Sequence, residues 1–162
     1  MHQKPGPGQL PQEAVVDAFV TASRVLVAMA ARSLADAGEE VTLTQYRSLV
    51  VLASRGPQGV ASLAEAVAVT PPTASRLVDR LVRKGLVVRR TDRHDRRHVR
   101  IALTEVGRQL IDVVTEHRRS EIAALLQTIP VKEQRSMVEG LVKLAAAAGE
   151  VPEQDWSSGW DL

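Results

Sequence analysis

A short central segment of the sequence carries most of the chain's positive charge. Residues 76–100 read RLVDRLVRKGLVVRRTDRHDRRHVR, with ten Lys and Arg residues against three Asp, a net charge of +7. The whole chain carries only +2, so the rest of it is negative. Charge this concentrated repels itself unless a polyanion neutralises it, and a row of DNA phosphates does so. The segment therefore indicates nucleic-acid binding, with an Arg-rich solvated face as the alternative.

Side chains at the start of this segment are of the types that read base pairs. Arg76 can donate two parallel hydrogen bonds to guanine, and Thr73 can pack on a thymine methyl group. Arg80 follows one helical turn later and is better placed for a phosphate. Arginines at a narrow hairpin tip suit a minor groove, whose negative potential attracts them. The candidate DNA contacts are Thr70, Pro72, Thr73, Ser75, Arg76, Arg80, Arg93, Arg96 and Arg97, with Asp95 expected to orient a neighbouring arginine.

Two helices are predicted to hold these residues in place. Ser62 and Glu65 have the spacing of a capping box, which predicts the start of a short helix. Thr70 can cap a second helix that has proline at its first position and ends at Gly85. Capping is the preferred interpretation for Thr70, and DNA contact is the alternative.

A period-two pattern follows the second helix and predicts a β-hairpin. Strands are expected over residues 86–91 and 98–103, joined by a charged turn over 92–97. A further short strand is expected at 58–61. A helix, a turn, a second helix and then a hairpin with a basic tip is the order of a winged helix-turn-helix, in which the second helix enters the major groove.

Segments with apolar residues at helical spacing surround this core. Helices are predicted over 12–37 and 44–55, from Thr104 as N-cap, and from 131 after a proline. The first and the last two carry more apolar surface than a winged core of this size can cover, so they are expected to dimerise. The candidate dimer contacts are Val15, Phe19, Ile122, Leu126, Leu141 and Leu144. The predicted fold class is mainly α (α+β).

The predicted organisation has four parts. They are a flexible lead-in at 1–11, a dimerisation region at 12–40 and 108–148, a DNA-binding domain at 41–107 and a polar tail at 149–162. The tail contains both tryptophans of the chain.

The residues of the core, taken in order, resemble the MarR family of bacterial transcription regulators. The family's recurring elements appear as Thr73-Ala-Ser-Arg76, Leu81 through Arg89, Asp95-Arg96-Arg97, and Leu103-Thr104 with Gly107. Ser75 stands where Thr is frequent in the family. The motif covers about residues 62–107, and flanking helices in the family's order extend the resemblance to roughly 12–148.

The resemblance implies an obligate homodimer whose terminal helices intertwine and whose two winged domains read a palindrome. It also implies a regulator, typically a repressor, that loses DNA affinity when a small, often aromatic or phenolic, ligand binds between the dimerisation helices and the DNA-binding lobe. Phe19 and Tyr46 are candidates to line such a pocket, and both also suit the hydrophobic core. A winged helix that acts through protein–protein contacts, or that binds DNA non-specifically without an effector, is the alternative.

Composition excludes several other classes of protein. The chain has no Cys, which excludes disulfides, thiolate metal sites and thiol-oxidation sensing. Asp92, His94, Asp95 and His98 could hold a catalytic metal only among arginines that repel it, so neither an enzyme nor a cofactor is expected. There is no run of eighteen apolar residues and no apolar leader at the start, so a cytoplasmic protein without membrane contact is expected.

Overall fold

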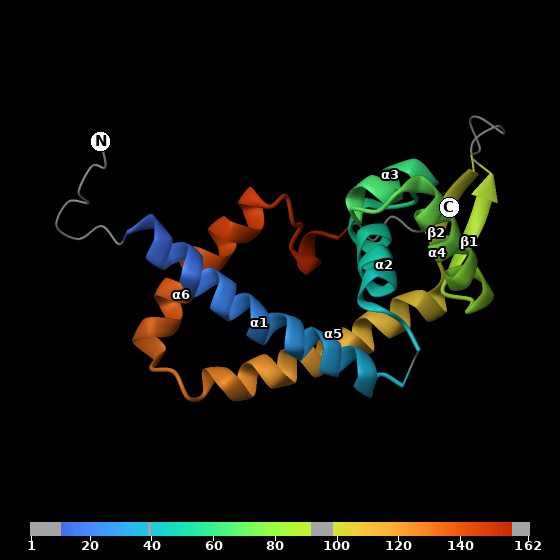
Figure 1. Ribbon diagram of the computed structural model, residues 1–162. Helices are drawn as coiled ribbons and strands as arrows, with labels where there is room; N and C mark the ends of the chain where they lie inside the picture. The colour runs from blue at the N-terminus through green and yellow to red at the C-terminus, as the bar shows by residue number, and fades with distance from the viewer. Residues whose placement is uncertain (1–10, 39, 92–98, 157–162) are drawn as a thin grey trace, which may run out of the picture.

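The computed structural model describes residues 11–38, 40–91 and 99–156 (Figure 1). In chain order the elements are α1 (Gln12–Asp36), α2 (Leu43–Arg55), α3 (Val60–Ala66), α4 (Pro71–Arg83), β1 (Val87–Thr91), β2 (Val99–Leu103), α5 (Glu105–Leu126), α6 (Val131–Ala147) and the short 3-10 helix η1 (Glu153–Asp155). Helices dominate, and the described residues form one sheet of two antiparallel strands, which confirms the predicted fold class. The predicted lead-in falls, apart from Pro11, outside the described residues.

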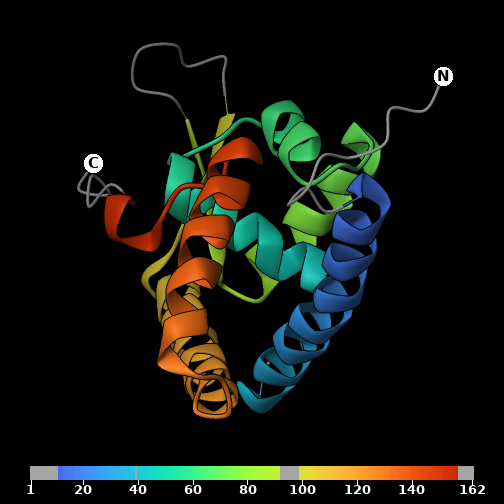
Figure 2. The same cartoon turned by 90° about the vertical axis from the view of Figure 1, so that its left-hand side faces the viewer.

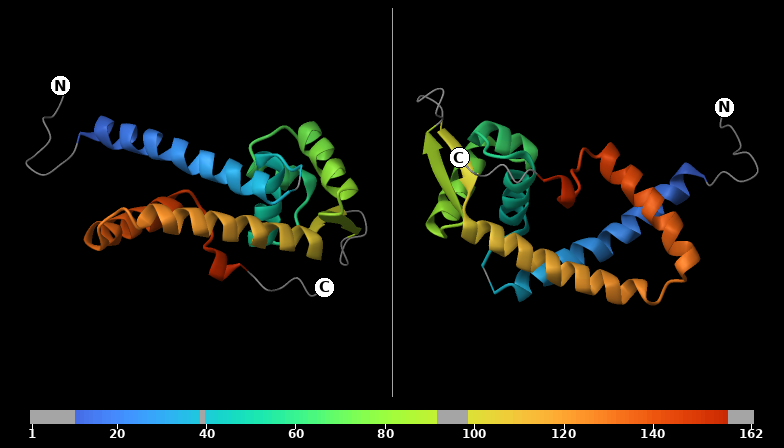
Figure 3. Two further views of the ribbon diagram at one scale, coloured as in Figure 1. Left: turned by 90° about the horizontal axis from the view of Figure 1, so that it is seen from below. Right: turned by 180° about the vertical axis from the view of Figure 1, so that it is seen from behind.

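The elements form a winged lobe with a group of longer helices beside it. Helices α2, α3 and α4 and the β1–β2 hairpin pack together in the lobe, at the right of Figure 1. Helix α5 starts at the hairpin and leads out of the lobe, α1 crosses α5, and α6 turns back from the far end of α5. Figures 2 and 3 show α1 and α6 on opposite sides of the molecule.

A core of aliphatic side chains joins the lobe to the first half of α5. The largest completely buried side chains are Leu49, Leu52, Leu63, Leu81, Leu86, Ile101 and Ile111. They come from α2, α3, α4, β2, α5 and the turn before β1, so all parts of the lobe share one core. Burial of apolar surface stabilises such a core by about 25 cal/mol per Å², and it fixes α4 relative to the hairpin.

A capping box that the sequence analysis did not identify begins α2. The Gln45 amide donates to the Thr42 hydroxyl (3.2 Å), and the Thr42 amide donates to the Gln45 side chain (3.0 Å). The Thr-x-x-Gln spacing was the available signal. The helix consequently begins at Leu43, one residue earlier than predicted.

The predicted start of α3 is wrong. Ser62 lies inside this helix, and Gly59 occupies the N-cap position, where its carbonyl accepts a hydrogen bond from the Leu63 amide (3.0 Å). The earlier start lets Val60 pack against the core. Packing of an apolar face outweighs a local capping preference in a helix this short.

The strand predicted at 58–61 is reduced to a single β-bridge. Gln58 donates its amide to the Ile101 carbonyl (3.0 Å) and accepts a hydrogen bond from the Ile101 amide (2.7 Å). The chain after Gly59 already belongs to α3, so this pairing does not extend. The bridge still fastens β2 to the segment between α2 and α3.

A tight junction connects the end of α4, the hairpin and the start of α5. Gly85 has a φ of +70°, the left-handed conformation that ends many helices. The Thr104 hydroxyl donates to the Gly85 carbonyl (2.6 Å) and accepts from the Gly107 amide (3.1 Å), which confirms Thr104 as the predicted N-cap. A Cβ atom at Gly107 would lie 2.2 Å from the Leu86 carbonyl oxygen. Only glycine therefore fits at this position.

Helix α1 is highly exposed for its apolar content. Of the described helices, it alone is long and apolar enough to cross a membrane, with a mean hydropathy of 1.7 in the most apolar window, of which 6% is buried. The buried residues of α1 are Met29, Ser33 and Leu34, all in its second half. The first half presents an apolar surface that the described part of the single chain does not cover.

Candidate nucleic-acid interface

Helix α4 has one face in the core and one face in solvent. The inner face consists of Ala74, Leu77, Val78 and Leu81, all buried. Of the predicted DNA contacts on this helix, Pro72, Thr73, Arg76 and Arg80 are exposed and Ser75 is half-buried. Because the core holds the inner face, the exposed side chains of the first turns are presented together on one side of the lobe.

The start of α4 is not capped by a side chain. Thr70 occupies the N-cap position and a proline follows it, as predicted, but the Thr70 hydroxyl makes no hydrogen bond to a backbone amide. This hydroxyl instead lies 2.9 Å from the Thr73 hydroxyl, and both side chains are exposed. Pro71 and Pro72 at the first two positions of α4 have no amide proton, so this end of the helix presents the two hydroxyl groups with few free backbone donors.

An ion pair that the sequence analysis missed connects α4 to β1. Arg89 Nη2 lies 2.6 Å from Asp79 Oδ1, and the two side chains are 43% and 49% exposed. A pair this exposed contributes little to the folding free energy. It nevertheless neutralises one carboxylate on a surface that gathers cations. The two residues belong to a helix and a strand joined by a turn, so no periodic pattern signals their contact.

The described strands of the hairpin carry further exposed cations. Arg90 and Arg100 are partners across the sheet, and both are exposed. Arg100 also donates from Nη1 to the Pro57 carbonyl (3.3 Å). The predicted tip residues Arg93, Asp95, Arg96 and Arg97 lie outside the described residues, as do Asp92, His94 and His98. Within residues 11–38, 40–91 and 99–156, no group of three His, Cys, Asp or Glu side chains could hold a metal ion.

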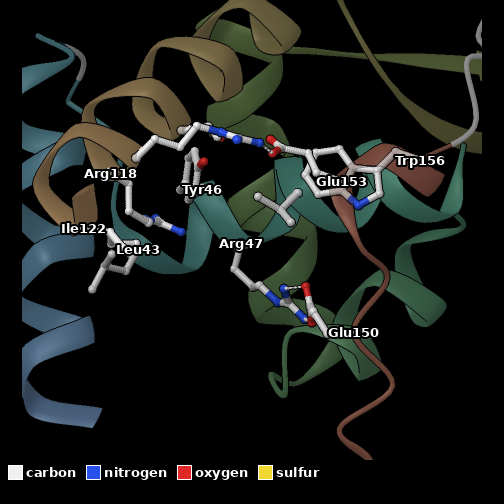
Figure 4. A pocket seen from close by; sticks show the side chains of 11 residues that line it. Leu43, Tyr46, Arg47, Arg118, Ile122, Glu150, Glu153 and Trp156 are labelled. Atoms are coloured by element: carbon white, nitrogen blue, oxygen red, sulfur yellow. Dashed lines mark hydrogen bonds and ion pairs between the residues drawn. The ribbon is translucent and has the colours of Figure 1, made fainter. Parts of the chain in front are cut away.

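A cavity of about 470 Å³ lies between α2, α5 and the segment after α6 (Figure 4). Its walls include Leu43, Tyr46, Arg47, Arg118, Ile122 and Trp156. Tyr46 belongs to the core and also reaches the cavity. Phe19, the other predicted pocket residue, lies on α1 with 45% of its surface exposed and is not part of these walls.

The surroundings of Tyr46 keep its phenol, a hydrogen-bonding group, in the neutral form. Burial raises its pKa, and a hydrogen bond with the Thr115 side chain and the charge of Arg118 oppose the rise. The Arg118 guanidinium lies 5.7 Å from the centre of the Tyr46 ring, within cation–π range. Tyr46 therefore stays protonated at neutral pH, beside a permanent positive charge.

Residues 149–156, called the C-terminal strap below, close one side of this cavity (Figure 4). Glu150 accepts two hydrogen bonds of 2.6 Å from Arg47, and Glu153 accepts one of 2.6 Å from Arg119. The hydrogen bonds from Arg47 lower the pKa of Glu150. From its sequence alone this segment is only a polar tail, because Arg47 precedes Glu150 by 103 residues.

Most residues predicted to dimerise are uncovered in the single chain. The exposed fractions are 38% for Val15, 45% for Phe19, 49% for Leu141 and 44% for Leu144, while Ile122 and Leu126 are half-buried. None of the residues of α6, a helix that is described throughout, is buried. These helices hold large apolar side chains in solvent.

Comparison with known proteins relates the chain to one family. The family model for the MarR family matches residues 41–99. The crystal structure of RV1404 from Mycobacterium tuberculosis is similar with a TM-score of 0.82 and 39% identity, over 90% of this chain and 99% of that one. A MarR family protein from Bacillus stearothermophilus has a TM-score of 0.71 and 27% identity, over 87% and 100%. The HTH-type transcriptional repressor MdtR of Bacillus subtilis is 29% identical over 74% of this chain and 77% of that protein.

These likenesses extend beyond the winged lobe. The family match covers α2, α3, α4 and β1 and ends at Val99, the first residue of β2, whereas the structural likeness also includes the long helices outside the lobe. A solvent-facing α4, a basic hairpin and the α5 junction are thus found in the order that the family's motifs predict. The chain belongs to the MarR family, and it is a transcriptional regulator whose winged helix is the DNA-binding part.

Proposed function

We propose that this protein is a cytoplasmic, homodimeric repressor that binds a palindromic operator and releases it when a small ligand fills the cavity. Residues 41–107 act as the DNA-binding domain, and 12–40 with 108–148 as the dimerisation region. The observation that carries the DNA-binding part is the exposed face of α4, where Thr73, Arg76 and Arg80 project from a helix whose other face is buried.

In this proposal each α4 lies in a major groove. Arg76 reads a guanine, while Thr73 and Ser75 contact neighbouring bases. Pro72 lies with them at the base edges, Arg80 contacts a phosphate, and Thr70 is a further candidate contact at the start of α4. On sequence grounds, Arg93, Arg96 and Arg97 at the hairpin tip add minor-groove and phosphate contacts, with Asp95 holding Arg97 in position.

A second copy of the chain is the partner proposed for the exposed apolar helices. The uncovered side chains lie on α1, at the end of α5 and on α6, which form one end of the molecule away from the winged lobe (Figure 1). A two-fold dimer buries the same surface on both copies and presents two winged lobes to a two-fold operator. Helix α1, long and apolar as it is, then packs against protein rather than lipid.

The dimer makes a direct prediction for hydrodynamic mass. Sedimentation equilibrium at micromolar concentration should give twice the mass of one chain. Leu141→Gln should weaken association by about 1 kcal/mol for each copy, because half of this side chain is still available for burial. Lys143→Gln, on the same helix, should leave association unchanged. A well-folded monomer for the parent protein would contradict both the dimer and the palindrome.

The cavity beside Tyr46 is the proposed effector site. Its volume falls within the range of about 300–1,000 Å³ that small-molecule pockets occupy in proteins. Its walls combine apolar side chains with a phenol and guanidinium groups, which suits an aromatic ligand that carries a polar substituent. Apart from the C-terminal strap, the walls belong to α2 of the lobe and α5 of the dimerisation region, so a ligand there can alter the position of the lobe relative to α5.

Selection of bound genomic DNA fragments tests the proposed readout most directly. A two-fold symmetric sequence should be enriched, and a duplex of random sequence should bind more weakly in a mobility-shift assay at the same salt concentration. Equal affinity for both duplexes would favour non-specific binding. The absence of any shift would favour a winged helix that acts through protein–protein contacts.

A further inference from the structure

The C-terminal strap is directed back to the winged lobe by the way α6 ends. The Glu150 amide donates to the Ala145 carbonyl (3.0 Å) and the Gly149 amide to the Ala146 carbonyl (3.1 Å). Gly149 has a φ of +68°, which reverses the direction of the chain at this point. The residues that follow run alongside the cavity instead of continuing the line of α6 (Figures 1 and 4).

Ion pairs tie the strap to both helices that form the cavity. Arg47 on α2 binds Glu150 through two parallel hydrogen bonds, and Arg119 on α5 binds Glu153 through one. The side chains in these pairs are between 34% and 65% exposed. Ion pairs this accessible to water are weak, so the strap is held in a way that a competing anion can overcome.

The strap also brings an aromatic ring to the same place. Trp156 is half-buried against the core, and its indole Nε1 donates to the Val151 carbonyl (2.9 Å). Two carboxylates and an aromatic ring thus meet a wall of guanidinium groups, aliphatic side chains and the Tyr46 ring. These are the groups through which an aromatic carboxylate would interact with that wall.

The strap leaves both space and one hydrogen-bond donor unused. The cavity retains about 470 Å³ with the strap in place. Arg118, in its wall, has a buried Nε that finds no hydrogen-bond acceptor within the described part of the chain. A buried donor without an acceptor is costly, so the packing of Arg118 beneath the strap is not at its optimum.

We propose that the strap is an internal competitor of the effector: Glu150 and Glu153 occupy the arginines that an aromatic carboxylate needs, and such a ligand displaces the strap as it enters. This inference rests on the proposed effector cavity. What it adds is a segment of the chain, the strap, whose release accompanies binding of such a ligand. Release would also detach the end of α6 from α2, which links the cavity to the dimerisation region.

Benzoate and benzamide, matched in shape and differing in charge, test the proposal by calorimetric titration. Benzoate should bind the parent protein more tightly than benzamide does. Glu150→Gln removes a competing carboxylate, so benzoate should bind roughly twofold to fivefold tighter, and Glu150→Gln with Glu153→Gln tighter still. Glu65→Gln, a loss of the same charge at an exposed site on α3, should leave the affinity unchanged.

A strap that only completes the pocket would give the opposite result. Glu150→Gln would then weaken benzoate binding, and this outcome would overturn the proposal, as would equal affinity for benzoate and benzamide or no binding of either. A second measurement follows the strap itself. In Trp160→Phe, Trp156 is the remaining tryptophan, and its emission should shift to longer wavelength as benzoate expels it into water. An unchanged spectrum at saturating benzoate would contradict displacement.

Failure of this inference can be distinguished from failure of the proposed function. If benzoate binds tighter to Glu150→Gln but does not alter operator binding, the strap competes at a cavity that does not control DNA. If the protein dimerises and binds its operator while benzoate gives none of the expected results, the proposed function as a DNA-binding regulator is supported and the proposed competition by the strap is wrong.

Discussion

Replacing Arg76 by alanine is expected to weaken operator binding more than any other single substitution on α4. A bidentate arginine–guanine contact contributes about 1–3 kcal/mol, and a dimer contains two. The complex should therefore lose about 2–6 kcal/mol, or roughly 30-fold to 10⁴-fold in affinity. Base preference at one position of each half-site should relax in a mobility-shift competition with operators altered at that position.

Arg83→Ala is the matched control for this experiment. Arg83 is exposed like Arg76 and its replacement removes the same charge, but it lies in the last turn of α4, away from the end proposed to meet bases. Its loss should weaken binding to all operators equally or leave it unchanged. If Arg76→Ala keeps the base preferences of the parent protein, Arg76 does not read a base.

Gly107→Ala is expected to have the largest effect on folding. The added Cβ would lie 2.2 Å from the Leu86 carbonyl oxygen and 2.9 Å from Leu103 Cδ1. The Leu86 carbonyl already accepts a hydrogen bond from the Thr104 amide (3.1 Å), so it cannot move away without losing that bond. We expect a loss of about 3 kcal/mol or more in the free energy of unfolding, measured by urea titration at one protein concentration.

Gly59→Ala separates this clash from the general cost of replacing a glycine. Gly59 lies in the same lobe and has an ordinary negative φ, and a Cβ atom added to it would meet no other atom within 4 Å. The substitution should cost about 1 kcal/mol or less, the difference between glycine and alanine as an N-cap. If both variants unfold at the same urea concentration, the contact with the Leu86 carbonyl is not the reason that position 107 needs a glycine.

The sequence was sufficient for the elements that depend on local signals. Proline after Thr70 and glycine at 85 mark the ends of α4, and the change from a helical period to a period of two marks the hairpin. The exposed face of α4 followed from the same pattern, because its apolar residues recur at helical spacing. Local signals were therefore enough to place the candidate DNA contacts on α4.

The features that could not be predicted depend on contacts between distant parts of the chain. The start of α3 depends on whether Val60 packs against a core that other helices build. Ser62 could cap a helix that starts later, but the helix with Val60 packed is the one that forms. The strap requires Glu150 to meet Arg47 across the whole fold, and its residues by themselves resemble any acidic tail. The Asp79–Arg89 pair likewise depends on how a strand settles against a helix.

The junction at Thr104 has a consequence for the spacing of the operator. Because the Thr104 hydroxyl is hydrogen-bonded both to the end of α4 and to the first turn of α5, the two helices are held at a fixed angle to each other. In the proposed dimer, the distance between the two α4 helices is then set by the angle between the two α5 helices. One base pair inserted between half-sites moves them about 3.4 Å apart and rotates one around the DNA axis. A dimer with a fixed angle between its α5 helices cannot adjust to both the added distance and the added rotation. The protein should therefore discriminate operators by the spacing between their half-sites as well as by their bases.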